Sequence, residues 1–266
     1  MRICLENSDE LSVYLGKQSF RMKMTPISDF SQIEKNLLEI AGERYLQKIY
    51  PTEDWLPKER RFVSHLVRKG FPIQECIVPD DDILHFRGRP CLLFRYISGE
   101  TEHRLKEGIL EGLGTLVANF HIESTVYLDK PENSSVGIVH GDLRQENIIV
   151  AKGNINLIDL DNAHEDFFYK DVGSMLLYIV EKELARKRDS NVMRSLCFLS
   201  SYQRTRQLST EDIKQLPQVI ISKCEDASTW SNDQYSKGLL SDEKLERTMR
   251  LMEKARMIAE SIVDDV

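Results

Sequence analysis

The chain has 266 residues, of which 41% are hydrophobic and 30% are charged. This balance is ordinary for a globular protein and excludes collagen, a lone coiled coil and a fully disordered chain. At about 150 residues per domain, the length predicts one large domain or two coupled domains. The formal net charge of −7 argues against a protein that binds nucleic acid through broad electrostatic attraction.

Three features predict a cytoplasmic protein without a membrane partner. The five cysteines are odd in number and include no Cys-x-x-Cys pair, which is typical of thiols in a reducing compartment. Charges interrupt the N-terminal sequence MRICLENSDELS before any apolar signal region. The longest plain apolar run, Met175 to Val180, falls far short of the roughly 20 residues that span a bilayer.

The first third of the chain is predicted to be mainly strand. Two apolar-rich runs, 36–41 and 45–50, surround a short turn that contains Gly42 and predict a hairpin. Apolar residues between Lys58 and Lys69 recur on one face of a helix. The run 89–97 predicts a further strand.

The rest of the chain is predicted to be mainly helical. Apolar residues between Leu105 and Phe120 follow a period of about 3.6 residues, and Val172 to Leu184 has a similar pattern. A stripe from Leu245 to Ile262 on a last long helix is interpreted as core packing. We place a lobe boundary near Ser98, which gives a strand-rich lobe over 1–97 and a helical lobe over 98–266.

Polar residues follow two apolar strands in the segment 138–161. Asp142 and Asn147 lie five residues apart in one polar loop, and Asp159 and Asp161 follow the next strand. Mg²⁺ prefers a few protein oxygens and fills its remaining positions with water or phosphate oxygens. We therefore expect Asn147 and Asp159 to hold Mg²⁺, and Asp142 to orient or deprotonate a hydroxyl nucleophile, as in phosphoryl transfer.

Neighbouring polar residues have alternative interpretations. Asp142 taken alone is also typical of a turn cap, and Asp161 is either close to the metal or in a surface loop. We expect His140 to brace the loop by hydrogen bonding and not to carry a proton, since Asp142 serves as the base. Asp171 is interpreted as an acidic residue at a helix N-terminus, where the helix dipole favours it.

These motifs resemble a known family. His140–Asn147 (HGDLRQEN) followed by Leu157–Asp161 (LIDLD) resembles the aminoglycoside phosphotransferase and choline kinase family, near its type-II homoserine kinase branch. The resemblance covers about residues 36 to 235. It implies an α+β, bilobal, protein-kinase-like fold with a strand-rich N-lobe and a helical C-lobe. It also implies a kinase that uses ATP and Mg²⁺ to phosphorylate a hydroxyl of a small molecule.

The resemblance assigns a nucleotide site to the first lobe. Lys48 is similar to the lysine that binds the nucleotide phosphates in this family, and Glu59 is the expected partner that holds it. Arg60 and Arg61 are alternative partners for Glu59. The hinge from Arg95 to Ile97 is expected to bind the adenine edge through backbone groups.

Two departures from the family pattern concern this nucleotide site. The segment 31–36, where a glycine-rich phosphate loop would lie, contains no glycine. Arg95 stands where an acidic residue is common in the family. Both departures favour an alternative interpretation as a non-catalytic binding module on the same fold. A protein Ser/Thr kinase is a further alternative, against which the absence of D-F-G and A-P-E motifs argues.

The phosphate acceptor is expected to bind the helical lobe. The segment 165–266 has 16 basic and 18 acidic residues, a near balance that argues against a polycationic ligand. An amino-alcohol, a hydroxy amino acid, a sugar and an aminoglycoside all stay open as acceptors, and the sequence does not indicate the oligomeric state. Aromatic anchors for an amine, with core packing as the alternative for each, are Phe167, Tyr169, Tyr202, Trp230 and Tyr235.

Overall fold

The computed structural model describes residues 2–5, 10, 14–15, 23–27, 32–101, 106–184 and 191–264. The chain forms two compact units. The first comprises Met1–Gly99 together with Asn156–Asp161, and the second comprises Glu100–Ile155 together with Asn162–Val266. The chain therefore leaves the second unit to contribute six residues to the first, which the sequence did not indicate.

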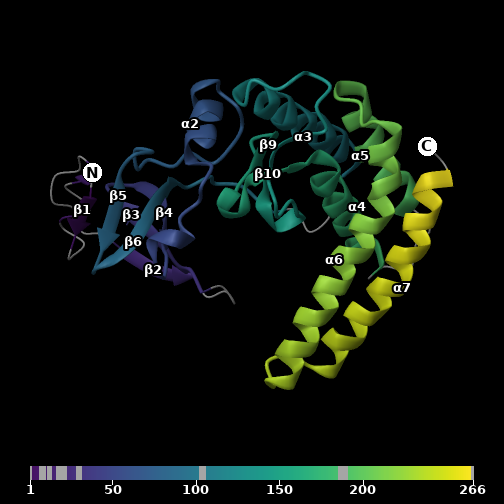
Figure 1. Ribbon diagram of the computed structural model, residues 1–266. Helices are drawn as coiled ribbons and strands as arrows, with labels where there is room; N and C mark the ends of the chain where they lie inside the picture. The colour runs from purple at the N-terminus through teal and green to yellow at the C-terminus, as the bar shows by residue number, and fades with distance from the viewer. Residues whose placement is uncertain are drawn as a thin grey trace. The chain divides into compact units, whose positions relative to one another are not determined.

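A six-stranded sheet makes up most of the first unit (Figure 1). Neighbouring strands are antiparallel, except that the first strand runs parallel to the fifth. The helix α2 (Arg60–Arg68) buries Phe62, Val63 and Leu66, and a short turn of helix, η1 (Glu53–Trp55), precedes it. The strands, in sheet order, are β1 (Arg2–Leu5), β5 (Ile83–Phe86), β6 (Arg89–Arg95), β4 (Glu43–Ile49), β3 (Glu34–Ile40) and β2 (Lys23–Ile27).

The expected hairpin is formed by β3 and β4. Ala41 and Gly42 connect the strands with positive φ angles of 54° and 79°, as a two-residue turn that matches the right-handed twist of the strands requires. This turn sets the register, in which Lys35 lies directly opposite Lys48.

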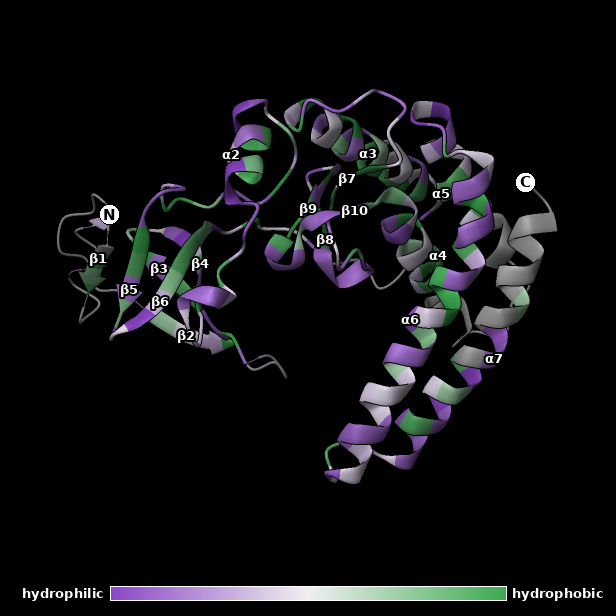
Figure 2. Ribbon diagram, in the orientation of Figure 1, coloured by the Kyte–Doolittle hydropathy of each residue, from purple (hydrophilic) through white to green (hydrophobic). Residues whose placement is uncertain are grey.

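Strand β6 anchors this hairpin in the sheet. All residues from Pro90 to Phe94 are buried, and Figure 2 shows the strand hydrophobic along most of its length. β6 pairs with β4 from Tyr45 to Ile49. Since a strand with a fully buried core is strongly held in register, β6 fixes the position of Lys48.

The second unit contains five helices and short strands among the described residues, and the elements Asn154–Leu157 (β9) and Leu160–Asn162 (η3) include residues of the first unit. β7 pairs antiparallel with β10, β8 pairs with β9, and two short 3-10 turns lie between them. The expected α+β class is confirmed. The elements are α3 (Glu107–Tyr127), β7 (Val136–Val139), η2 (Gln145–Asn147), β8 (Ile148–Ala151), β9 (Asn154–Leu157), η3 (Leu160–Asn162), β10 (His164–Phe167), α4 (Phe168–Leu184), α5 (Asn191–Thr205), α6 (Thr210–Ser236) and α7 (Asp242–Asp264).

The last two helices lie side by side (Figure 1). On the stripe that was interpreted as core packing, Leu245 is partly buried but Met249 is 51% exposed. Leu251, which is buried, was not part of the predicted stripe, so core packing is not supported at Met249. The side chains of Met252, Ala255, Ala259 and Ile262 lie outside the described part of the chain, as do residues Ser31 and Leu105.

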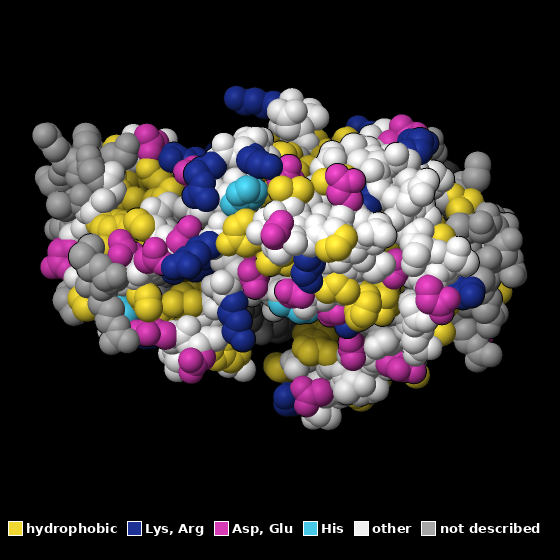
Figure 3. Space-filling view, turned by 45° about the horizontal axis from the view of Figure 1, so that its top comes forward, with side chains coloured by type: hydrophobic (Ala, Val, Ile, Leu, Met, Phe, Trp, Pro, Cys, Tyr) yellow, Lys and Arg dark blue, Asp and Glu magenta, His cyan; other side chains and the backbone are white. Residues whose placement is uncertain are grey.

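The surface carries charges of both signs. On the face shown in Figure 3, acidic and basic side chains are interspersed. In the part of the chain that the structure describes, no helix combines the length and the apolar character that crossing a membrane requires.

Candidate active site

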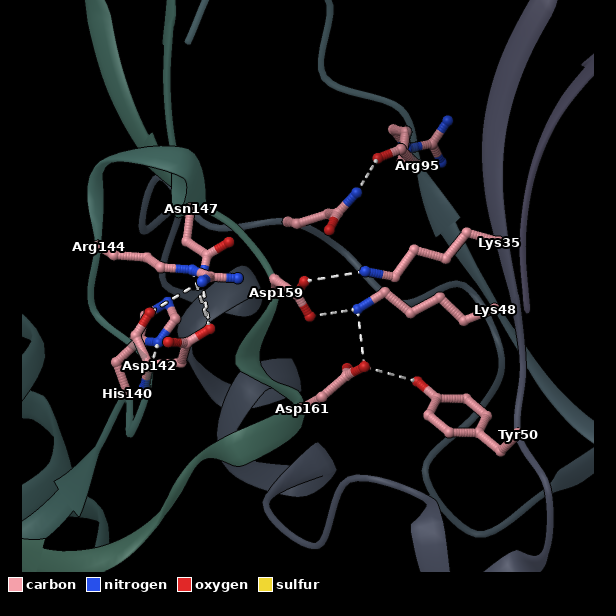
Figure 4. A network of polar contacts seen from close by, with 11 residues as sticks. Lys35, Lys48, Tyr50, Arg95, His140, Asp142, Arg144, Asn147, Asp159 and Asp161 are labelled. Atoms are coloured by element: carbon pink, nitrogen blue, oxygen red, sulfur yellow. Dashed lines mark hydrogen bonds and ion pairs between the residues drawn. The ribbon is translucent and has the colours of Figure 1, made fainter. Parts of the chain in front are cut away.

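A buried lysine forms the centre of the first unit's polar network (Figure 4). Lys48 on β4 is only 1% exposed. Its Nζ lies 2.6 Å from Asp159 Oδ1 and 2.9 Å from Asp161 Oδ2. Because a buried charge is tolerated when it is paired and hydrogen-bonded, these two carboxylates explain how an ammonium group is held inside this unit.

A second lysine shares the carboxylate of Asp159. Lys35 Nζ lies 3.5 Å from Asp159 Oδ2, and its residue faces Lys48 across the β3–β4 ladder. Like charges directly opposite each other repel, and the carboxylate between them offsets this repulsion. The sequence analysis missed Lys35. The signal was available in the spacing, because a two-residue turn at Ala41 and Gly42 places residues 35 and 48 in register.

Asp161 belongs to this network and not to a surface loop. Its side chain is 10% exposed, and its Oδ2 accepts a hydrogen bond of 3.3 Å from the Tyr50 hydroxyl. Burial raises the pKa of Asp161; the Lys48 ammonium opposes this effect and Asp159 adds to it. Burial and the nearby Asp161 carboxylate also raise the pKa of Tyr50.

Glu59 lies at the start of the helix α2, as the sequence analysis expected. It is the residue before the first turn of α2, and its carbonyl oxygen accepts a hydrogen bond of 3.1 Å from Val63 N. The carboxylates that hold Lys48 are those of Asp159 and Asp161. A Lys48–Glu59 ion pair therefore stays a prediction.

The two hinge residues expected to bind adenine, Arg95 and Ile97, differ in whether their backbone groups are already hydrogen-bonded. Arg95 N donates to the Glu75 carbonyl (2.9 Å), and its guanidinium Nε lies 2.7 Å from Glu75 Oε2. Tyr96 N donates to Arg44 O. Ile97 has no backbone hydrogen bond within the described residues. Of the two hinge residues expected to bind adenine, Ile97 is the one with free backbone groups.

In the second unit, a buried carboxylate fixes the polar loop that follows β7. Asp171, in the first turn of α4, is 2% exposed. It accepts hydrogen bonds from His140 N (2.6 Å) and Gly141 N (3.1 Å). Gly141 has a φ of +78°, and an added Cβ would overlap the carbonyl oxygen of Asn162. The interpretation of Asp171 as an ordinary helix-start charge was therefore incomplete, because the side chain braces the loop.

A buried histidine completes the support of this loop. His121 Nε2 lies 3.2 Å from Asp171 Oδ2, and Nδ1 lies 2.8 Å from the Tyr202 hydroxyl. Burial lowers the pKa of His121, which favours the neutral imidazole. Burial alone would raise the pKa of Asp171, but the hydrogen bond from His121 and the backbone N–H of His140 outweigh it and leave that pKa below its ordinary value.

Asp142 and Asn147 contact each other in the loop (Figure 4). Asn147 Nδ2 donates to Asp142 O (2.8 Å) and to Asp142 Oδ2 (3.0 Å). Because the amide nitrogen is used in this way, Asn147 Oδ1 is the atom left for a cation. Arg144 Nε lies 3.2 Å from Asp142 Oδ2. His140 is buried, and its Nδ1 accepts a weak 3.4 Å hydrogen bond from Asp142 N, which supports the expected bracing role.

Each of the two residues expected to hold Mg²⁺ offers an oxygen atom. Asn147 offers an amide oxygen in the second unit, and Asp159 offers a carboxylate in the first. Within the described ranges, no three or more His, Cys, Asp or Glu side chains gather as a metal site. Each residue taken by itself is a hard oxygen donor of the kind that Mg²⁺ accepts from a protein, its other ligands being water and phosphate.

A protein-family match covers the loop that contains Asp142 and Asn147. The model of the phosphotransferase enzyme family matches residues 126–208, which include Asp142, Asn147, Asp159 and Asp171. The resemblance predicted from the sequence is confirmed, and it supports a small-molecule kinase. The sequence matches none of the curated proteins.

Solved structures share the fold over nearly the whole chain. An amicoumacin kinase, hAmiN, in complex with AMP-PNP, Ca²⁺ and Ami has a TM-score of 0.69 at 14% identity, covering 96% of this chain and 94% of that one. An aminoglycoside phosphotransferase from Alicyclobacillus acidocaldarius has a TM-score of 0.65 at 9% identity, covering 94% and 93%. A microcompartment-associated aminopropanol kinase has a TM-score of 0.61 at 14% identity, covering 92% and 93%.

Proposed function

We propose that the protein is a kinase that transfers the γ-phosphoryl group of ATP to a hydroxyl of a small molecule and requires Mg²⁺. The observation that carries the proposal is the pair of contacts from Asn147 Nδ2 to Asp142. These contacts fix a carboxylate for the acceptor and leave an amide oxygen for a cation. The complex of the amicoumacin kinase with AMP-PNP and Ca²⁺ supports a nucleotide with a divalent metal.

Each residue of the site has a proposed task. Asp142 accepts the proton of the acceptor hydroxyl, a contribution typically worth about 10²–10⁴-fold in rate. Lys48 binds the nucleotide phosphates. Asn147 and Asp159 hold Mg²⁺, which when bound neutralises charge on the phosphates. Asp161 positions the ammonium of Lys48, with which it pairs at 2.9 Å.

Two further contacts to the nucleotide complete the proposal. Lys35 adds a second ammonium group at the place where the segment 31–36 lacks the glycines of a phosphate loop. The backbone of Ile97 binds the adenine edge. The five cysteines are free thiols, which supports the proposed cytoplasmic location.

A turnover assay tests the proposal. ADP release is measured with ATP and Mg²⁺ against amino-alcohols, hydroxy amino acids, sugars and aminoglycosides. We expect turnover with one acceptor class and a loss of about 10²-fold or more in Asp142→Asn. The matched control is Asp233→Asn, which removes an exposed carboxylate paired with Lys237 on α6.

Two results would contradict the proposal. Full turnover in Asp142→Asn would show that this carboxylate has no part in the chemistry. The absence of both turnover and Mg²⁺-dependent thermal stabilisation by ATP would favour a non-catalytic binding module instead.

A further inference from the structure

A pocket of about 390 Å³ lies within the second unit. It is lined by the end of β7 and by β10, α4 and α6, and it reaches Gly141, the residue before Asp142. On its α4 side, Gly173 allows close packing, because an added Cβ would lie 2.7 Å from Val219 Cγ1. A pocket of this size takes a small molecule. Asp142, which is proposed to act on the acceptor, follows the lining residue Gly141 in the chain.

The pocket lining contains polar groups with no protein partner. Ser174 on α4 is only 4% exposed, yet its hydroxyl makes no hydrogen bond within the described residues. Because it has no partner among the described residues, this hydroxyl is available to a ligand. One face of α6 presents five more side chains without a hydrogen bond or ion pair in the described part of the chain: Gln215, Gln218, Ser222, Lys223 and Asp226.

The open charges in this pocket are one cation and one anion. Lys223 and Asp226 are three residues apart on α6, so their side chains are neighbours on the helix surface, but they do not pair with each other. The other charged side chains of the lining already have partners. Asp166 Oδ2 lies 2.7 Å from Lys170 Nζ and 3.2 Å from His164 Nε2, and Asp171 is bonded to the loop.

The pocket lacks the aromatic cage that a quaternary amine requires. Of the five aromatic anchors considered from the sequence, Tyr169 alone is among the lining residues. Tyr202 is fully buried and bonded to His121, so it is a core residue. Phe167, Trp230 and Tyr235 are exposed and do not line the pocket.

We infer that this is the acceptor pocket and that it takes a hydroxylated zwitterion. Lys223 binds the carboxylate of the acceptor, and Asp226 binds its ammonium group. Gln215, Gln218 and Ser174 donate and accept hydrogen bonds along its length. The hydroxyl group points to the Gly141 end of the pocket, beside Asp142. A polycation would meet one open carboxylate here, next to an open ammonium that repels it. The inference rests on the proposed kinase function for the transfer step.

A matched series of alcohols tests the charge requirement. L-homoserine carries both charges, 3-amino-1-propanol carries the amine alone, 4-hydroxybutyrate carries the carboxylate alone, and kanamycin is a polycation. We expect kcat/KM for L-homoserine to exceed the others by about 10-fold or more, since each charged hydrogen bond contributes on this scale. Equal or better turnover of any of the other three would overturn the inference and leave the kinase proposal standing.

Variants on α6 test whether Lys223 and Asp226 bind the charged groups of the acceptor. We expect Lys223→Gln and Asp226→Asn each to raise KM for L-homoserine about 10-fold, while KM for ATP is unchanged. Glu225→Gln, an exposed position on the same helix outside the lining, is the control and should behave as wild type. An unchanged KM for L-homoserine in both pocket variants would show that the zwitterion binds elsewhere.

A binding measurement separates this inference from the kinase proposal. L-homoserine alone should raise the melting temperature of the wild type, and the two pocket variants should lose this shift. If L-homoserine gives neither a shift nor turnover, the inference is wrong. Turnover of the other alcohols and stabilisation by ATP with Mg²⁺ then decide the kinase proposal independently.

Discussion

Replacing Asp171 by Asn removes the charge that holds the loop of His140 and Gly141 while keeping the shape of the side chain. Its two carboxylate oxygens accept from three N–H groups: His140 N at 2.6 Å, Gly141 N at 3.1 Å and His121 Nε2 at 3.2 Å. An asparagine has one accepting oxygen. If this oxygen faces His140 and His121, the amide nitrogen faces the N–H of Gly141, and two donors meet in a buried site.

The cost follows from this geometry. Losing a hydrogen bond to a charged group costs about 1.5–3 kcal/mol, and leaving a buried N–H unpaired costs about 1–3 kcal/mol. Because the two costs overlap, we expect Asp171→Asn to lower the free energy of unfolding by about 2–4 kcal/mol. Asp142 follows Gly141 directly, so a displaced loop should also lower kcat, by up to about 10²-fold.

Urea denaturation and steady-state kinetics measure these two effects. Asp233→Asn on the exposed face of α6 is the control and should change the free energy of unfolding by less than about 0.5 kcal/mol. A change of similar size in Asp171→Asn, with normal kcat, would refute the reasoning that this carboxylate fixes the loop.

Three further predictions concern other parts of the site. Lys35→Gln should raise KM for ATP about 10-fold without a loss of fold, as ATP titration and circular dichroism would show; an unchanged KM would remove Lys35 from the nucleotide site. Gly141→Ala should destabilise the protein by about 1–3 kcal/mol and lower kcat, whereas Gly153→Ala, with a φ of +83° but no atom near the added Cβ, should cost less and leave kcat unchanged. Burial lowers the pKa of His121 in the folded protein, so between this lowered pKa and about 6.5 the unfolded chain binds more protons than the folded one. The free energy of unfolding should therefore fall as pH falls, by up to about 1.4 kcal/mol per pH unit. His121→Gln should flatten this slope in urea titrations at several pH values, and an unchanged slope would contradict the prediction.

Local patterns predicted much of the fold. The hairpin of β3 and β4, the helix α2 and the helices α3, α4 and α7 all follow from hydrophobic period and turn residues, because these signals act over a few neighbours in the chain. Strand β1 was not predicted individually, since its parallel pairing with β5 joins residues about 80 positions apart. No local pattern encodes a pairing of that range.

In the candidate site, only contacts between residues close in the chain could be predicted from local patterns. The loop residues Asp142 and Asn147 contact each other because their spacing of five brings them together within one turn. Two partners of Lys48, Asp159 and Asp161, are 111 and 113 positions away (159 − 48 and 161 − 48), so no local pattern could indicate these contacts. Tyr202 was considered as an anchor because aromatic composition alone does not distinguish a ligand contact from a buried hydrogen bond to His121.

The carboxylate shared by Lys35 and Lys48 has a consequence for nucleotide affinity. In the free protein the two ammonium groups already have two anionic partners, because Asp159 contacts both and Asp161 pairs with Lys48. The charges of the site are therefore balanced before any phosphate arrives. On the proposed function, binding is then an exchange of counter-ions and not the filling of an empty cationic site. Such an exchange releases little net electrostatic energy, which favours a nucleotide that arrives with its own divalent cation over the free polyanion.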